Sequence, residues 1–416
     1  MTAEVAIMNT KGIALAADSA VTLGVGDGKT YNTADKLFAL SKYHPVGIMI
    51  YSSARIMGIE WETIIKNYRD NLGKKSFDKL SDYAGDFINF LAKFPYFTSE
   101  QMLVYLEIMC FDVFSHILSW FLDDLHIEFD GKENIELGQI DAVFNKSLKD
   151  IKERLKKEED EKVIKVDCQF IDSNPEAINK ELKKVFEDYK LSKKQIAEII
   201  DILKLVFQKC GGWIDDFTGI VIAGYGEREI FPTICDFKVS GKLGDSLIYF
   251  EYDLNQIGTD HTASICPYAQ SDMVHQFARG YSREFYNAIV EKVDTIMTSL
   301  LPLIKDFNKE KADSLSKLLT EYMDVFSDIV YKQPVIDIVA CMEKSELTSM
   351  AEAMVNLTAL KRHVSTDKET VGGPIDVALI TKGDGFIWIN KKTNYDPHLN
   401  RHLRQKYFRG EINENV

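Results

Sequence analysis

The first nineteen residues constrain the fold more strongly than any other stretch of the chain. In MTAEVAIMNTKGIALAADS, two apolar runs, Val5–Met8 and Ile13–Ala17, flank turn-forming residues at positions 9–12. Apolar runs around a short turn that contains Asn and Gly are typical of a β-hairpin. Because a hairpin brings its two ends together, we expect Asp18 to lie beside Thr2 in the folded protein.

Strand and helix patterns alternate along the rest of the chain. In chain order, the predicted elements are strands at 37–40 and 46–51, a helix at 54–72, helices over 75–210, strands over 217–241, one long helix at 271–304, further helices to about 363, and strands over 371–392. This order of strands, helices, strands, helices and strands favours an α+β fold. Two sheets with helices on their outer faces would satisfy it, because each apolar sheet face needs a partner layer.

Composition indicates a globular protein of 416 residues with a substantial core, since 45% of the residues are hydrophobic. The net charge of −14 argues against a nucleic-acid-binding surface, which needs concentrated Lys and Arg. The six cysteines show no CxxC or Cys/His ligand spacing, and the eight histidines include no HExxH motif. We therefore expect reduced thiols, a cytoplasmic location, no metal site and no cofactor.

No membrane association is expected from the sequence. The N-terminus lacks the basic and apolar regions of a signal peptide. The most apolar long window, Met102–Leu122, contains Glu107, Asp112 and His116, each of which is costly at the centre of a bilayer. We interpret this window as a buried helix.

Thr2 is a candidate nucleophile. If Met1 is removed, as is usual when a small residue follows, the chain begins with a free α-amine on Thr2. An α-amine has a pKa of about 7.7 to 8.0, so near neutral pH it can take a proton from the hydroxyl of the same residue. One residue would then supply both nucleophile and general base.

Such a nucleophile needs a nearby cation and a carboxylate that holds the cation in place. Asp18 follows the second strand of the hairpin, and Lys36 precedes the predicted strand at 37–40. We expect both to lie near the chain start. Taken singly, each residue fits an ordinary role: a second residue, a turn carboxylate and a surface lysine. Their order and spacing together favour a functional group.

The segments that carry these residues resemble the β-subunits of the proteasome and their bacterial relatives. Thr2, GIALAADSAVTLG with Asp18 sixteen positions after Thr2, and TADKLFAL with Lys36 follow the order seen in that family. The resemblance identifies the chain as a member of the threonine peptidase branch of N-terminal nucleophile (Ntn) hydrolases. It implies that Thr2, Asp18 and Lys36 form the catalytic triad.

Later segments extend the resemblance. The family's oxyanion-hole glycine aligns best with Ser52, and PYAQSDMVHQF places Ser271 on the family's supporting serine. Ser271 is equally well explained as the N-cap of the following helix. The family's Asp and Ser beside Gly-Gly would fall near Asp367 or Lys368 and on Val371. The supporting hydrogen-bond network is therefore altered or shifted in this chain.

The resemblance implies a four-layer αββα sandwich with a large helical insertion. Its expected parts are a first core segment at 1–94, the helical insertion at 95–212, and a second core segment at 213–416 with a smaller insertion near 305–340. The implied activity is hydrolysis of peptide bonds through an acyl-enzyme. The implied partners are peptide or protein substrates, further copies of the chain, and an ATP-dependent unfoldase.

Two other functions also fit the sequence. A non-catalytic assembly or scaffold protein could keep the sandwich without the chemistry, as Val371 and the missing oxyanion glycine indicate. A small-molecule amidase could use the same nucleophile on the same fold. The state of the N-terminus separates the scaffold from the enzymes, and a comparison of peptide with simple amide substrates separates the two enzymes.

Overall fold

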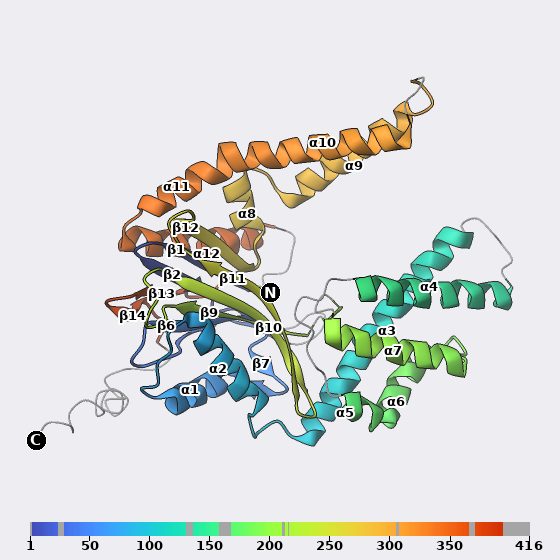
Figure 1. Cartoon of the computed structure of the whole chain (residues 1–416), viewed down its shortest axis with the longest axis horizontal. Helices are drawn as coiled ribbons and strands as arrows, with labels where there is room; N and C mark the ends of the chain where they lie inside the picture. Colours follow the sequence, from blue (N-terminus) through green and yellow to red (C-terminus); the bar gives the residue numbers. More distant parts are fainter. Residues whose placement is uncertain are drawn as a thin grey trace, which may run out of the picture. The chain divides into compact units, whose positions relative to one another are not determined.

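The chain divides into two compact units, Met1–Leu37 with Ile257–Val416, and Phe38–Gln256. Figure 1 labels their helices and strands. The computed structural model describes residues 2–23, 29–129, 136–157, 168–209, 213–214, 216–304, 308–365 and 371–393. Both units combine antiparallel strands with helices, which confirms the α+β class. The four-layer stacking and the boundaries near 94 and 212 stay predictions.

The first unit contains a five-stranded sheet in the order β12-β1-β2-β13-β14, with antiparallel neighbours throughout. Its strands are β1 (Ala3–Asn9), β2 (Gly12–Ala17), β12 (Ala263–Ala269), β13 (Asp376–Thr381) and β14 (Gly385–Asn390), and a separate pair is β3 (Val21–Leu23) with β4 (Lys29–Tyr31). Its helical elements are α8 (Asp272–Arg279), α9 (Arg283–Leu300), α10 (Lys309–Ser327), the π-helical turn η2 (Asp328–Lys332), α11 (Gln333–Cys341) and α12 (Lys344–Val364).

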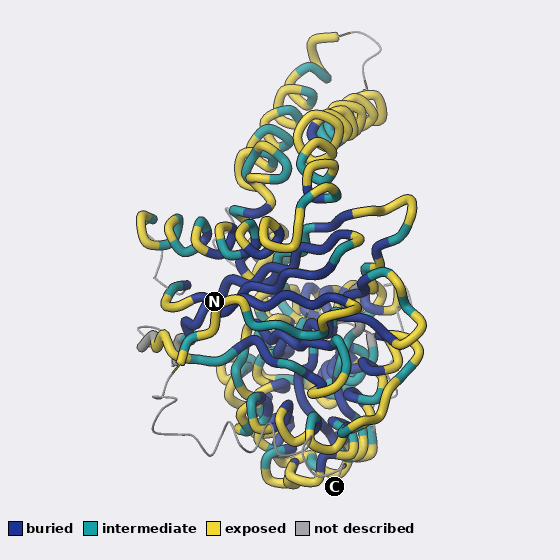
Figure 2. The backbone as a smooth tube through the Cα atoms, turned by 90° about the vertical axis from the view of Figure 1, so that its left-hand side faces the viewer, coloured by how far each residue is buried: buried dark blue, intermediate teal, exposed yellow. Residues whose placement is uncertain are grey.

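The core of this unit lies between the sheet and α12. Alternate residues of β1, namely Ala3, Val5 and Ile7, pack with Leu347 and Val355 of α12. Because side chains alternate between the faces of a strand, the even-numbered residues of β1 lie on the opposite face. All of β1 and β2 is buried, and the central strands appear dark blue in Figure 2.

The second unit contains a sheet in the order β11-β10-β9-β6-β5 and two apolar cores. Its strands are β5 (Leu37–Ala39), β6 (Val46–Ser52), β7 (Arg55–Ile56), β8 (Ile59–Glu60), β9 (Thr218–Gly224), β10 (Thr233–Leu243) and β11 (Ser246–Gln256). Its helices are α1 (Trp61–Leu72), α2 (Leu80–Ala92), α3 (Ser99–Phe129), α4 (Leu137–Lys157), α5 (Cys168–Asp172), α6 (Pro175–Val185) and α7 (Lys193–Lys209).

The helix α3 is the one described helix long and apolar enough to cross a membrane by length and composition. Its buried side chains, among them Leu106, Phe114 and Ile117, belong to a core shared with residues of α4, α6 and α7. This packing is that of a core helix, as its sequence predicts. A single long apolar helix is weak evidence for a membrane span, because buried core helices have the same length and composition. The cytoplasmic location stays a prediction.

Two predicted helix boundaries are wrong. The helix expected from residue 54 begins only at Trp61, because Met57 and Gly58 adopt positive φ angles and turn the chain into the short β7–β8 hairpin. The single helix expected over 271–304 is broken at Gly280, which has a φ of 79° and ends α8. Ser282 then caps α9 by accepting a hydrogen bond from the amide of Phe285.

Candidate active site

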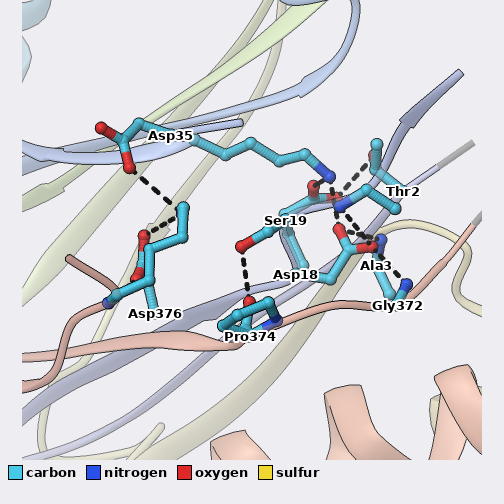
Figure 3. Close-up of polar contacts among 12 residues, drawn as sticks. Thr2, Ala3, Asp18, Ser19, Asp35, Gly372, Pro374 and Asp376 are labelled. Carbon is cyan, nitrogen blue, oxygen red and sulfur yellow. Dashed lines mark hydrogen bonds and ion pairs between the residues drawn. The ribbon is translucent and has the colours of Figure 1, made fainter. Parts of the chain in front are cut away.

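The β1–β2 hairpin places Asp18 next to the start of β1. Strand pairing sets Glu4 opposite Ala17, and the amide of Asp18 donates to the carbonyl of Ala3 at 3.1 Å. The Asp18 carboxylate in turn accepts from the amide of Ala3 at 3.2 Å. This juxtaposition is the one that the hairpin pattern predicts, and Figure 3 shows Asp18 beside Thr2 and Ala3.

Lys36 is buried against Asp18. Its Nζ donates to Asp18 Oδ1 and lies 3.4 Å from Glu4 Oε1. The side chains of Lys36 and Asp18 are only 3% and 1% exposed. A buried ion pair keeps its charges only where further hydrogen bonds support it. The structure thus brings together three of the predicted site residues, Thr2, Asp18 and Lys36.

The other oxygen of Asp18 is held by backbone amides. Asp18 Oδ2 accepts from Ala20 at 3.3 Å and from Gly372 at 2.9 Å. The neighbouring Ser19 donates its amide to the carbonyl of Gly372 at 3.2 Å and its hydroxyl to the carbonyl of Pro374. The segment before β13 therefore fixes the orientation of Asp18, and with it the position of the Lys36 ammonium.

Glu4 is a further candidate site residue, which the sequence analysis missed. The Thr2 hydroxyl donates to Glu4 Oε2 at 3.0 Å, and Glu4 is 2% exposed. The two residues are two positions apart on an extended segment, so they share the sheet face opposite α12. The available signal was an acidic residue inside the apolar run AEVAIMN, directly after the candidate nucleophile.

Burial dominates the electrostatics of Glu4. Removal of the carboxylate from water raises the pKa of Glu4 to about 8, and the neighbouring Lys36 ammonium opposes this shift. The Asp18 carboxylate adds a smaller upward effect on the same pKa. Two carboxylates and one ammonium would carry a net charge of −1, and a proton on Glu4 makes the group neutral.

Ser271 lies at the edge of this site. It occupies the N-cap position of α8, although its side chain makes no capping hydrogen bond. The preceding residue, Gln270, donates its amide to the carbonyl of Thr2 at 3.1 Å. Among the described residues, no hydrogen bond joins Ser271 to Thr2. The structure thus supports the N-cap position for Ser271 and leaves its supporting role a prediction.

Ser52 belongs to the other unit, at the end of β6. It has a φ of 71°, a left-handed conformation that favours glycine. Its proposed contribution to an oxyanion hole stays a prediction.

The loop before β13 contains the predicted departures. Asp367 and Lys368 lie outside the described residues. Val371 has no hydroxyl group, and its side chain is 7% exposed and packs in the apolar core with α12. Gly372 contributes its amide instead. Among the described residues, no group of three or more His, Cys, Asp or Glu side chains is arranged to hold a metal ion.

No protein-family model matches this chain, and no curated protein matches it. Solved structures that match include Anbu (ancestral beta-subunit) from Yersinia bercovieri, with 9% identity, coverage of 98% of this chain and 94% of that one, and a TM-score of 0.27. A Gly-1 mutant of Anbu from Hyphomicrobium sp. strain MC1 shows 11% identity, full coverage of both chains and a TM-score of 0.29.

These comparisons overturn the family assignment made from the N-terminal motifs. Identities of 9–11% with TM-scores of 0.27–0.29 show neither a shared fold nor a shared activity. The chain is not placed in the proteasome β-subunit family.

Proposed function

We propose that this chain is an N-terminal threonine hydrolase that cleaves peptide or other amide bonds through an acyl-enzyme. The observation that carries the proposal is the polar group on β1, in which the Thr2 hydroxyl, Glu4, Lys36 and Asp18 are joined by hydrogen bonds and ion pairs. A hydroxyl held beside a carboxylate and an anchored ammonium is one arrangement that can activate a nucleophile.

The proposed reaction begins once Thr2 is the first residue of the chain. Thr2 Oγ1 attacks the amide carbonyl and loses its proton to a nearby base, for which the α-amine is the candidate from sequence. The C–N bond then breaks, the departing amine takes the proton, and the acyl group stays on Oγ1 as an ester. Water hydrolyses the ester and regenerates the hydroxyl. Lys36, held by Asp18, stabilises negative charge near Oγ1.

Incubation with a fluorescent peptide β-lactone tests the proposal, because this probe acylates a reactive hydroxyl. We expect one adduct per chain, mapped by mass spectrometry to residue 2, and none in Thr2→Ala. Thr10→Ala, an exposed threonine in the β1–β2 turn, is the matched control and should label normally. Absence of label in wild-type protein whose N-terminal residue is Thr2 contradicts the proposal.

The burial of Thr2 favours a second candidate function. Thr2 is 3% exposed, and its hydroxyl already has a partner. In a non-catalytic scaffold, the same buried group would fix the end of the sheet. Protein from the native host that still begins with Met1 and carries no probe would support this alternative.

If the probe does label Thr2, hydrolysis rates of peptides and simple amides distinguish a peptidase from a small-molecule amidase.

We propose a second copy of this chain as a partner, bound through α10 and η2. Five exposed apolar residues follow the 3-4 spacing of a coiled-coil seam: Leu315, Leu318, Tyr322, Val325 and Ile329. Their exposed fractions lie between 43% and 65%. Figure 2 shows the α9–α10 pair at the top, mostly in yellow. The expected ATP-dependent unfoldase rests on the resemblance alone and stays a prediction.

A further inference from the structure

We propose that Glu4 is the general base that takes the hydroxyl proton of Thr2 during attack. This inference rests on the proposed function. It assigns to Glu4 the role of general base, which the sequence analysis gave to the α-amine of Thr2 acting through a water. In the step, the proton of Oγ1 moves to Glu4 Oε2 while Oγ1 bonds to the carbonyl carbon. Glu4 then returns the proton to the leaving group when the bond to that group breaks.

The direction of the hydroxyl supports this role. Thr2 Oγ1 donates to Glu4 Oε2 at 3.0 Å, a distance within the range for direct proton transfer. No intervening water is required at this separation. The other oxygen, Glu4 Oε1, makes no hydrogen bond and faces the Lys36 ammonium at 3.4 Å. Each oxygen of the carboxylate therefore has a distinct neighbour, the reacting hydroxyl or the cation.

The groups around Glu4 explain why it can exchange a proton near neutral pH. Asp18 follows β2, and Lys36 lies in the segment before β5; these are the charged groups that act on Glu4 most strongly. On the flanking strands, Glu4 pairs with Ala17 of β2 and Tyr268 of β12. Burial favours the neutral acid and Lys36 favours the carboxylate, so the pKa of about 8 lies close to the working pH that suits a general base.

The test is the pH dependence of labelling by the peptide β-lactone, in wild type and Glu4→Gln. The wild-type rate should rise with pH and level off above about pH 8, because a base must lose its proton to act. Glutamine keeps a carbonyl oxygen as hydrogen-bond acceptor but cannot take the proton. Glu4→Gln should label at least about 100-fold more slowly and should lose this rise.

Asp384→Asn is the matched control. Asp384 also lies in the first unit, in an exposed pair with Lys344, and among the described residues no hydrogen bond or ion pair joins it to Thr2. This variant should keep the wild-type rate and pH profile. Glu4→Gln that labels within tenfold of wild type, with the rise retained, overturns the role of Glu4 and identifies the α-amine as the base.

Glu4→Asp keeps the inference testable if the glutamine variant does not fold. Aspartate is shorter by one methylene group, so we expect slower labelling with a pH rise at a shifted midpoint. An unchanged rate and midpoint would contradict the proposal. A different result would show that the proposed hydrolase function itself is wrong. In that case the β-lactone would not label wild type, or it would label wild type and Thr2→Ala to the same extent.

Discussion

Asp18 organises the polar group at the chain start. Its two oxygens accept from Lys36 and from the amides of Ala3, Ala20 and Gly372. These donors come from parts of the chain up to 354 positions away. A single buried carboxylate therefore connects the hairpin, the segment before β5 and the segment before β13.

Replacement of Asp18 by Asn should abolish activity and destabilise the first unit. Loss of one member of a buried ion pair leaves the Lys36 ammonium without its closest partner, at a cost of about 3–5 kcal/mol in the free energy of unfolding. Urea unfolding measures the loss. Asp384→Asn, which breaks an exposed pair with Lys344, is the control and should change stability little. Equal effects of the two variants would contradict the proposed importance of burial.

Glu4 should make the free energy of unfolding depend on pH. Its pKa is about 8 in the folded protein and about 4.3 in an unfolded chain, so the folded state binds more protons between these values. Stability from this group is fully present below about pH 4.3 and falls as pH rises towards 8, by at most about 1.4 kcal/mol per pH unit. Urea unfolding of Glu4→Gln at pH 5.5, 6.5 and 7.5 should show a smaller decline than that of wild type.

At the scale of elements, α10 has one side that packs within its own unit. The apolar seam from Leu315 to Ile329 of η2 lies outside this packing. Ser327 is buried and donates its hydroxyl to the carbonyl of Arg279 in α8, and Ala312 is also buried. The seam residues lie exposed on the same helix. A helix that exposes a stripe of large apolar residues is typical of a surface that binds a partner.

Val325→Glu should convert an oligomer into a monomer. A charge within the seam opposes burial against a second copy, because an unpaired charge loses its hydration. Light scattering after size-exclusion chromatography measures the change, and the association should weaken at least tenfold. Asp313→Lys, on the same helix but off the seam, should leave the mass unchanged. A wild-type monomer at micromolar concentration would contradict the proposed contact.

At the scale of the whole molecule, the two units have separate apolar cores. The core of the first unit is centred on β1, β2 and α12, whereas the second has one core on β6 and β9 and another among α3, α4 and α7. Cooperative units of this kind open with different free energies. A local defect should therefore remain largely within its own unit.

Gly219→Ala tests this independence. In β9, the added Cβ would lie 1.9 Å from the ring of Tyr51 on the paired strand β6, so the ring must move. We expect a loss of about 1–3 kcal/mol. Hydrogen exchange should increase in β6, β9 and β10 but not in β1, β2 and β13. Asp18→Asn should give the reverse pattern. Equal increases in both units for either variant would show a single cooperative unfolding.

The local sequence was sufficient to predict the hairpin, the α+β class and the proximity of Thr2, Asp18 and Lys36. These features depend on alternation, turn residues and short loops, which act within a few tens of residues. The start of α1 and the break at Gly280 were not predicted. Both depend on residues with positive φ angles, and the spacing of apolar residues in the sequence does not reveal such angles. The family assignment failed because short motifs shared in order do not establish a common family.

The sequence by itself determined that a hydroxyl residue and an acid would lie near each other at the open end of one hairpin, because chain connectivity and turn length impose that proximity. Only the tertiary structure decided how the acid is held and which group accepts the hydrogen bond of the hydroxyl. Gly372 reaches Asp18 across 354 positions, and Glu4 acquires its raised pKa only when the folded sheet excludes water. The physical reason is that burial and long-range hydrogen bonding are properties of the packed protein, whereas residue periodicity is a property of the chain.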